Sequence, residues 1–184
     1  MITLKNQSGR KTAKELFGWV ESLVFAVVIL VVVNSFFFRT TVVDGSSMEP
    51  TLYEPEYLLV SKLFYDVPEK GDIITFYSAH YWDAVLVKRV IANEGDIVDI
   101  DYSTGNVSVN GEVLDEPYIL ERIRFEDDVE MPYEVPEGCV FVMGDNRNGS
   151  TDSRNTTVGP VKYETIIGEV LFRIFPLNRI GTVR

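Results

Sequence analysis

Hydrophobic residues are concentrated in one long run near the N-terminus, whereas the rest of the chain alternates short apolar segments with turn signals. The run covers residues 16–38 (LFGWVESLVFAVVILVVVNSFFF). Its one charged residue, Glu21, lies near the N-terminal end, where it can reach lipid headgroups. Roughly 20 apolar residues span a bilayer as a helix. The run therefore predicts a transmembrane helix.

The charges that flank this run predict its orientation. Four basic residues precede it, namely Lys5, Arg10, Lys11 and Lys14. Only Arg39 follows closely, and cytoplasmic flanks are enriched in Lys and Arg. Residues 1–15 are therefore expected to be a cytoplasmic basic arm and residues 39–184 to be extracytoplasmic. A cleaved signal peptide is the competing interpretation, but the run is too long for one, and the following RTTVV contains no small-x-small cleavage pattern.

From Tyr57 onward the pattern predicts short β-strands. Segments rich in Val, Ile, Phe and Tyr alternate with turn signals such as PEKGD and NEGD. Asn110-Gly111 between two extended arms predicts a tight hairpin. The expected strands include 57–61, 73–77, 84–91, 97–100 and 166–173. The predicted fold class is thus a mainly β domain with one N-terminal transmembrane α-helix, in which residues 97–137 form a smaller inserted β subdomain.

Composition narrows the range of functions. A hydrophobic fraction of 46% in 184 residues can build one domain core. After Arg39 the chain has 12 basic and 26 acidic residues, a formal charge of −14, which argues against a nucleic-acid partner. The single cysteine, Cys139, cannot form an internal disulfide. Its setting in EGCVFVMGD predicts a small buried strand residue.

The segment VVDGSSMEPTL, residues 42–52, has the pattern of an active-site turn. Gly45 permits a sharp change of direction and Pro50 prevents a regular helix. Ser46 and Ser47 are therefore presented on a bend, where a hydroxyl can lie beside backbone N–H groups, as a serine nucleophile and its oxyanion hole require. A surface turn that uses serine only because serine suits turns is the alternative.

A second candidate is the strand AVLVKRVI, residues 84–91. Alternate side chains of a strand face opposite ways, so one of Lys88 and Arg89 must face the core. Asp83 can complement Arg89, which leaves Lys88 for the buried face. A buried amine loses solvation, its pKa falls, and it can act as a base. The alternative is that both cations reach solvent along their stems.

The third candidate is the polar loop that follows VFVM, residues 144–154. A calcium loop is one interpretation, but Arg147 falls at a ligand position and no acidic residue occupies the twelfth place, Thr156. A Ser-His-Asp triad would need His80, the only histidine, which lies in an aromatic loop without a carboxylate pattern to orient it. A serine paired with Lys88 needs no histidine.

Four segments in this order resemble the motif boxes of bacterial type I signal peptidases: GSSMEPTL, PEKGDIITF, VLVKRVIANEGD and MGDNRNGSTDSR. They extend from Gly45 to Arg154 after a single N-terminal anchor. The resemblance implies a signal-peptidase-type coiled β-sheet domain that cleaves preproteins through a Ser-Lys dyad.

By this resemblance Ser47, rather than Ser46, is the nucleophile, Lys88 is the general base and Ser150 orients the lysine. Four residues correspond to positions that hold the site together: Asp145, Arg147, Asp152 and Arg154. Gly45 replaces a serine found in some members, so the oxyanion hole is expected to depend on the Ser47 N–H, with Gly45 allowing close approach of the substrate. The resemblance implies that five residues line the substrate pocket: Thr41, Val43, Met48, Leu86 and Val87.

The implied partners are the lipid bilayer and exported preproteins with small residues at positions −1 and −3. No cofactor or metal is expected, and the implied location is the bacterial cell membrane. Two alternatives stay open. One is a Ser-Lys peptidase dedicated to one pilin or cell-wall precursor, and the other is an anchored domain that only binds partners.

Overall fold

The computed structural model describes residues 5–62, 67–78 and 83–183, and divides into two units, residues 1–38 and 39–184. The first unit is a single helix, α1 (Lys5–Phe37), so part of the basic arm is helical. The stretch Lys14–Val32 is long and apolar enough to cross a membrane, and none of it is buried within the protein.

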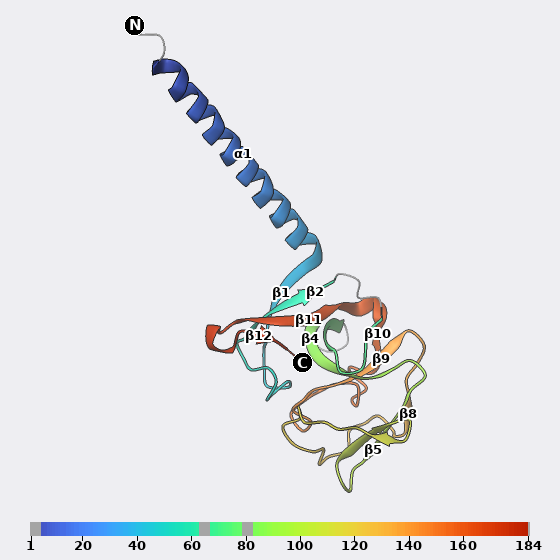
Figure 1. The fold of residues 1–184 in the computed structure, drawn as a ribbon. Coiled ribbons are helices and arrows are strands. Elements are labelled where there is room, and N and C mark those ends of the chain that lie inside the picture. The colour runs from blue at the N-terminus through green and yellow to red at the C-terminus, as the bar shows by residue number, and fades with distance from the viewer. Residues whose placement is uncertain (1–4, 63–66, 79–82, 184) are drawn as a thin grey trace. The chain divides into compact units, whose positions relative to one another are not determined.

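The second unit is built on a large β-sheet in which β11 lies between β2 and β3. Figure 1 shows β11 beside β2. The strand order is β1-β2-β11-β3-β4-β9-β10, and β12 pairs with β11. Its strands are β1 (Phe38–Val42), β2 (Tyr57–Ser61), β3 (Ile73–Ser78), β4 (Ala84–Asn93), β9 (Cys139–Met143), β10 (Val161–Lys162), β11 (Ile166–Phe175) and β12 (Gly181–Thr182). Two 3-10 helices, η1 (Tyr163–Thr165) and η2 (Leu177–Arg179), flank β11. The predicted fold class, mainly β with one N-terminal helix, is confirmed.

A second, four-stranded sheet is inserted between β4 and β9. Its strand order is β7-β6-β5-β8, with β5 (Ile97–Asp101), β6 (Asn106–Val109), β7 (Glu112–Val113) and β8 (Tyr133–Glu134). Asn110 and Gly111 both have positive φ, as the predicted hairpin turn between β6 and β7 requires.

Buried apolar side chains form three clusters. One joins the small sheet to β9 and contains Cys139, which is buried as predicted. The second contains Met48 and Leu52 together with Val43 and Val60. The third lies along the centre of the large sheet, with Ile74, Val90 and Val142 among its members. The core therefore supports both β4 and the turn that carries the two serines.

Candidate active site

The turn that carries Ser47 is shaped by buried residues on either side of it. Gly45 has a φ of +84°, which glycine adopts without strain. Met48 and Leu52 are almost fully buried and are joined by a hydrogen bond from the Leu52 N–H to the Met48 carbonyl, 2.8 Å. Burial of these two side chains pulls the turn onto the core and leaves Ser47 half-buried at its edge.

Lys88 reaches this serine from the middle of β4. The residue is only 3% exposed, and its Nζ lies 2.7 Å from the Ser47 Oγ and 3.1 Å from the Val87 carbonyl oxygen. Burial lowers the pKa of the amine from 10.5 to about 8, against the attraction of the Asp152 and Asp145 carboxylates. Lys88 is therefore buried as predicted, and because burial lowers its pKa the amine can accept a proton near neutral pH.

Arg89 does not pair with Asp83, so that prediction is wrong. Arg89 is also buried, and its guanidinium binds both oxygens of the Asp145 carboxylate, with Nε–Oδ1 2.8 Å and Nη2–Oδ2 2.7 Å. Asp83 lies before the start of β4 and accepts a hydrogen bond from the Tyr77 hydroxyl. The error arose because the true partner, Asp145, is remote from Arg89 along the chain. It follows β9, the strand that pairs with β4.

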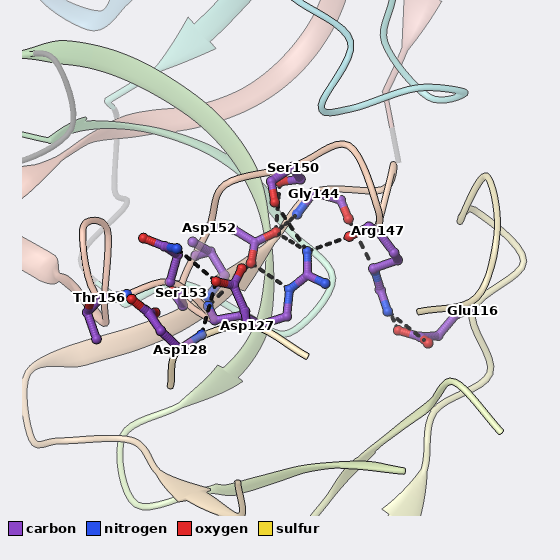
Figure 2. Close-up of polar contacts among 12 residues, drawn as sticks. Glu116, Asp127, Asp128, Gly144, Arg147, Ser150, Asp152, Ser153 and Thr156 are labelled. Carbon is purple, nitrogen blue, oxygen red and sulfur yellow. Dashed lines mark hydrogen bonds and ion pairs between the residues drawn. The ribbon is translucent and has the colours of Figure 1, made fainter. Parts of the chain in front are cut away.

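The polar loop after β9 is organised around the buried carboxylate of Asp152. This carboxylate accepts hydrogen bonds from the Gly144 N–H (2.9 Å), the Ser150 hydroxyl (2.7 Å) and the Arg154 guanidinium (2.8 Å to each oxygen). Burial opposes ionisation of Asp152, but Arg154 and these hydrogen bonds outweigh it and hold the pKa of Asp152 below its ordinary value. Figure 2 shows Ser150, Gly144 and Asp152 converging.

Arg147 connects the same loop to Glu116, which lies in the segment between β7 and β8 of the small sheet (Figure 2). Its guanidinium binds the Glu116 carboxylate, with Nη2–Oε1 2.6 Å, and donates to the Gly144 carbonyl at 3.1 Å. The Arg147 carbonyl in turn accepts a hydrogen bond from Arg154 at 2.7 Å. Asp145, Arg147, Asp152 and Arg154 are thus all buried, and each binds a partner of opposite charge.

Gly144 lies where the polar loop touches the Ser47 turn. A β-carbon at this position would meet the Ser150 side chain and the Ser47 carbonyl oxygen at distances that real structures do not contain. The neighbouring Asn146 N–H donates to that carbonyl at 3.1 Å, and its side chain donates to the Ser46 carbonyl at 3.2 Å. The close approach of the two loops therefore depends on a glycine, which sequence reasoning overlooked.

The Ser150 hydroxyl donates a hydrogen bond to the Asp152 carboxylate, and no hydrogen bond between Ser150 and Lys88 occurs within residues 83–183. Its lysine-orienting role stays a prediction. The Gly45 N–H donates to the Glu54 carboxylate at 3.0 Å, so it is engaged elsewhere than at an oxyanion. Among the described residues, the Ser47 N–H has no partner.

The predicted pocket residues do not all lie in one cluster. Val43, Met48 and Val87 pack in one apolar cluster, whereas Leu86 packs against another. Thr41 is half-buried on β1. The structure therefore brings three of the five together.

The sequence also raised a histidine triad and a metal site as alternatives. His80 lies outside the described residues. No group of three or more His, Cys, Asp or Glu side chains that could hold a metal ion occurs in the described part of the chain.

Sequence reasoning missed Thr51, whose hydroxyl donates to Asp145, and Glu116, the partner of Arg147. Thr51 belongs to the GSSMEPTL segment, which was a usable signal, whereas nothing distinguished Glu116 within its acidic surroundings.

Comparisons with known proteins agree on one family. The family model described as "Signal peptidase, peptidase S26" matches residues 16–175. The chain is 37% identical to a signal peptidase I of Bacillus licheniformis, across 97% of this chain and 98% of that protein. It is 34% identical to signal peptidase I T of Bacillus subtilis (strain 168), across 98% of each. The chain is also 30% identical in sequence to the protein in a crystal structure of a signal peptidase I from Enterococcus faecalis V583. This match covers 56% of the present chain and 97% of the crystallised one, with a TM-score of 0.45.

Proposed function

Because the chain belongs to the signal peptidase family, peptidase S26, we propose that it is a membrane-anchored serine endopeptidase whose dyad is Ser47 and Lys88. The observation that carries the proposal is the 2.7 Å separation between the Lys88 Nζ and the Ser47 Oγ, with the amine buried. A hydroxyl becomes a nucleophile when a neighbouring base accepts its proton.

The reaction would proceed in two stages. Neutral Lys88 accepts the proton of Ser47, whose Oγ attacks the carbonyl before the scissile bond, and the protonated amine then donates to the leaving nitrogen. A water molecule activated by Lys88 hydrolyses the resulting acyl-enzyme. The negative charge on the carbonyl oxygen is stabilised by backbone N–H groups, chiefly that of Ser47, which is not otherwise engaged among the described residues.

The substrates proposed are exported preproteins with small residues at positions −1 and −3. The peptide would lie as an added strand against a wall formed by Val43, Met48 and Val87, which pack together.

The proposed location is the bacterial cell membrane. α1 would cross the bilayer with the N-terminus in the cytoplasm, because basic residues are more numerous before the apolar run than directly after it. The domain over residues 39–184 would then be extracytoplasmic, where signal peptides emerge.

The test uses purified full-length protein in detergent and a preprotein with an intact signal peptide. Ser47→Ala and Lys88→Met are expected to abolish processing, whereas His80→Ala is expected to leave it nearly unchanged. Retained cleavage by either dyad variant would contradict the proposed mechanism.

Substrate range separates the general role from a dedicated one. Cleavage of several unrelated preproteins would exclude a peptidase restricted to one pilin or cell-wall precursor. A domain that only binds partners predicts no cleavage by the wild type at all.

A further inference from the structure

We propose that Thr51 is a positioning residue that sets the contact between Ser47 and Lys88. It acts through a bridge, defined here as Thr51, Asp145 and Arg89, that runs beside the dyad. The inference rests on the proposed dyad function, since it concerns the distance between the same two groups.

The bridge begins in the serine turn. Thr51 lies four residues after Ser47, and its hydroxyl donates to the Asp145 Oδ2. The same carboxylate binds the Arg89 guanidinium through both oxygens, at 2.8 Å and 2.7 Å. Because Arg89 is adjacent to Lys88 on β4, the bridge joins the segment that carries the hydroxyl to the strand that carries the amine.

Burial makes this bridge stiff. The side chains of Asp145 and Arg89 are 0% and 3% exposed, so water does not compete for their hydrogen bonds. A hydroxyl bound to an ionised carboxylate forms a short, strong hydrogen bond. Arg89 is also fixed by its donation to the Gly71 carbonyl at 2.9 Å and by the Tyr118 ring, 4.0 Å from the guanidinium carbon. Asp145 therefore offers Thr51 an anchor that cannot easily move.

Thr51 is held at its backbone by a separate group of residues. Its carbonyl oxygen accepts a hydrogen bond from the Arg173 Nη2 at 2.8 Å. Arg173 and Arg179 each form an ion pair of 2.7 Å with Glu56, which is buried. Since this anchor uses the carbonyl, a change of the Thr51 side chain leaves it in place. Removal of the hydroxyl should therefore loosen the bridge without detaching the turn.

Removal of the Thr51 hydroxyl should lower the rate of the chemical step. Misplacement of reacting groups by about 1 Å can cost on the order of a hundredfold in rate. The Thr51 hydroxyl is occupied by Asp145, and Thr51 is not among the residues proposed to line the substrate wall, so substrate binding should change little. The expected signature is a lower kcat with an unchanged KM.

The experiment compares Thr51→Val and Thr51→Ser with wild type on a preprotein in detergent. Thr51→Val keeps the shape but lacks the hydroxyl, and we expect kcat to fall by roughly ten- to a hundredfold with KM within about twofold. Thr51→Ser keeps the hydroxyl and should retain kcat to within about threefold. Thermal unfolding followed by circular dichroism checks that each variant is folded at the assay temperature.

Thr156→Val is the matched control. The Thr156 hydroxyl also donates to a carboxylate, that of Asp128 at 2.7 Å, but this pair is exposed. The control should keep the wild-type kcat. If Thr51→Val is unfolded, Thr51→Ala and Thr51→Ser replace it as the comparison, because both lack the methyl group and differ only in the hydroxyl.

Two results would overturn the inference. One is a folded Thr51→Val with kcat within about twofold of wild type, and the other is a Thr51→Ser as impaired as the variant without a hydroxyl. Ser47→Ala and Lys88→Met are measured alongside. If these two remain active, the proposed dyad fails; if they are inactive while Thr51→Val is not, only the role of Thr51 fails.

Discussion

Replacement of Lys88 by methionine should stabilise the fold at low pH while removing activity. The buried amine has a pKa lowered from 10.5 to about 8. At about 1.4 kcal/mol for each pH unit, the folded protein holds the ammonium form about 3 kcal/mol less favourably than the unfolded chain does. Methionine has a similar shape and no charge, so the variant does not carry this cost.

The sign of the effect follows from proton linkage. Below pH 8 both folded and unfolded states of the wild type are protonated at Lys88, and the full cost applies. Between pH 8 and 10.5 the folded state has released the proton that the unfolded state still binds, so wild-type stability rises with pH. Above 10.5 both states are neutral and the cost has disappeared.

The lost hydrogen bonds reduce the gain. The Lys88 amine contacts the Ser47 Oγ and the Val87 carbonyl, and each such contact contributes about 1 kcal/mol. We therefore expect Lys88→Met to be more stable than wild type by about 1 kcal/mol at pH 6 and less stable by about 2 kcal/mol above pH 10.5. The difference between the two proteins should change by about 3 kcal/mol across this range.

Urea unfolding of the full chain in detergent, followed by circular dichroism at several pH values, measures this change. Lys162→Met is the control, because it removes a lysine whose side chain is 67% exposed rather than buried. A Lys88→Met difference that stays constant from pH 6 to 10 would refute the argument that the amine is desolvated.

Two further predictions concern the rate and the loop contact. The catalytic rate should increase with pH up to the lowered pKa of Lys88, about 8, and level off above it, because only the neutral amine can accept the Ser47 proton. A pH–rate profile checks this prediction, and a rate independent of pH between 5 and about 8 would contradict it. Gly144→Ala should lower kcat by at least about tenfold, because the β-carbon of the alanine would meet Ser150 and the Ser47 carbonyl. A wild-type kcat in this variant would show that the Ser47 turn and the polar loop after β9 need not approach so closely.

Local patterns were sufficient wherever the cause of a feature is itself local. The apolar run specified α1, and Asn110-Gly111 specified the turn between β6 and β7, because only positive φ values close so short a hairpin. Alternation along residues 84–91 correctly indicated that a cation is buried. It could not show that Arg89 is buried as well, since an arginine faces the core only when a partner carboxylate is present there.

That partner is determined by strand pairing. In the register of β4 with β9, Arg89 lies opposite Met143, and Asp145 follows two residues later. A shift of this register by one residue would turn each side chain of β9 to the other face of the sheet. The Asp83 assignment failed because nothing between residues 83 and 91 carries this information.

The sequence by itself determined the mainly β class, the apolar helix, the burial of a cation in residues 84–91 and the order of the four motif segments. Folding determined which groups from these segments meet: the Lys88 amine with the Ser47 hydroxyl, and Thr51 with Asp145. The physical reason is that propensity and amphipathic alternation depend on neighbours a few residues apart, whereas both of these contacts join segments brought together only by packing of the sheet and its loops.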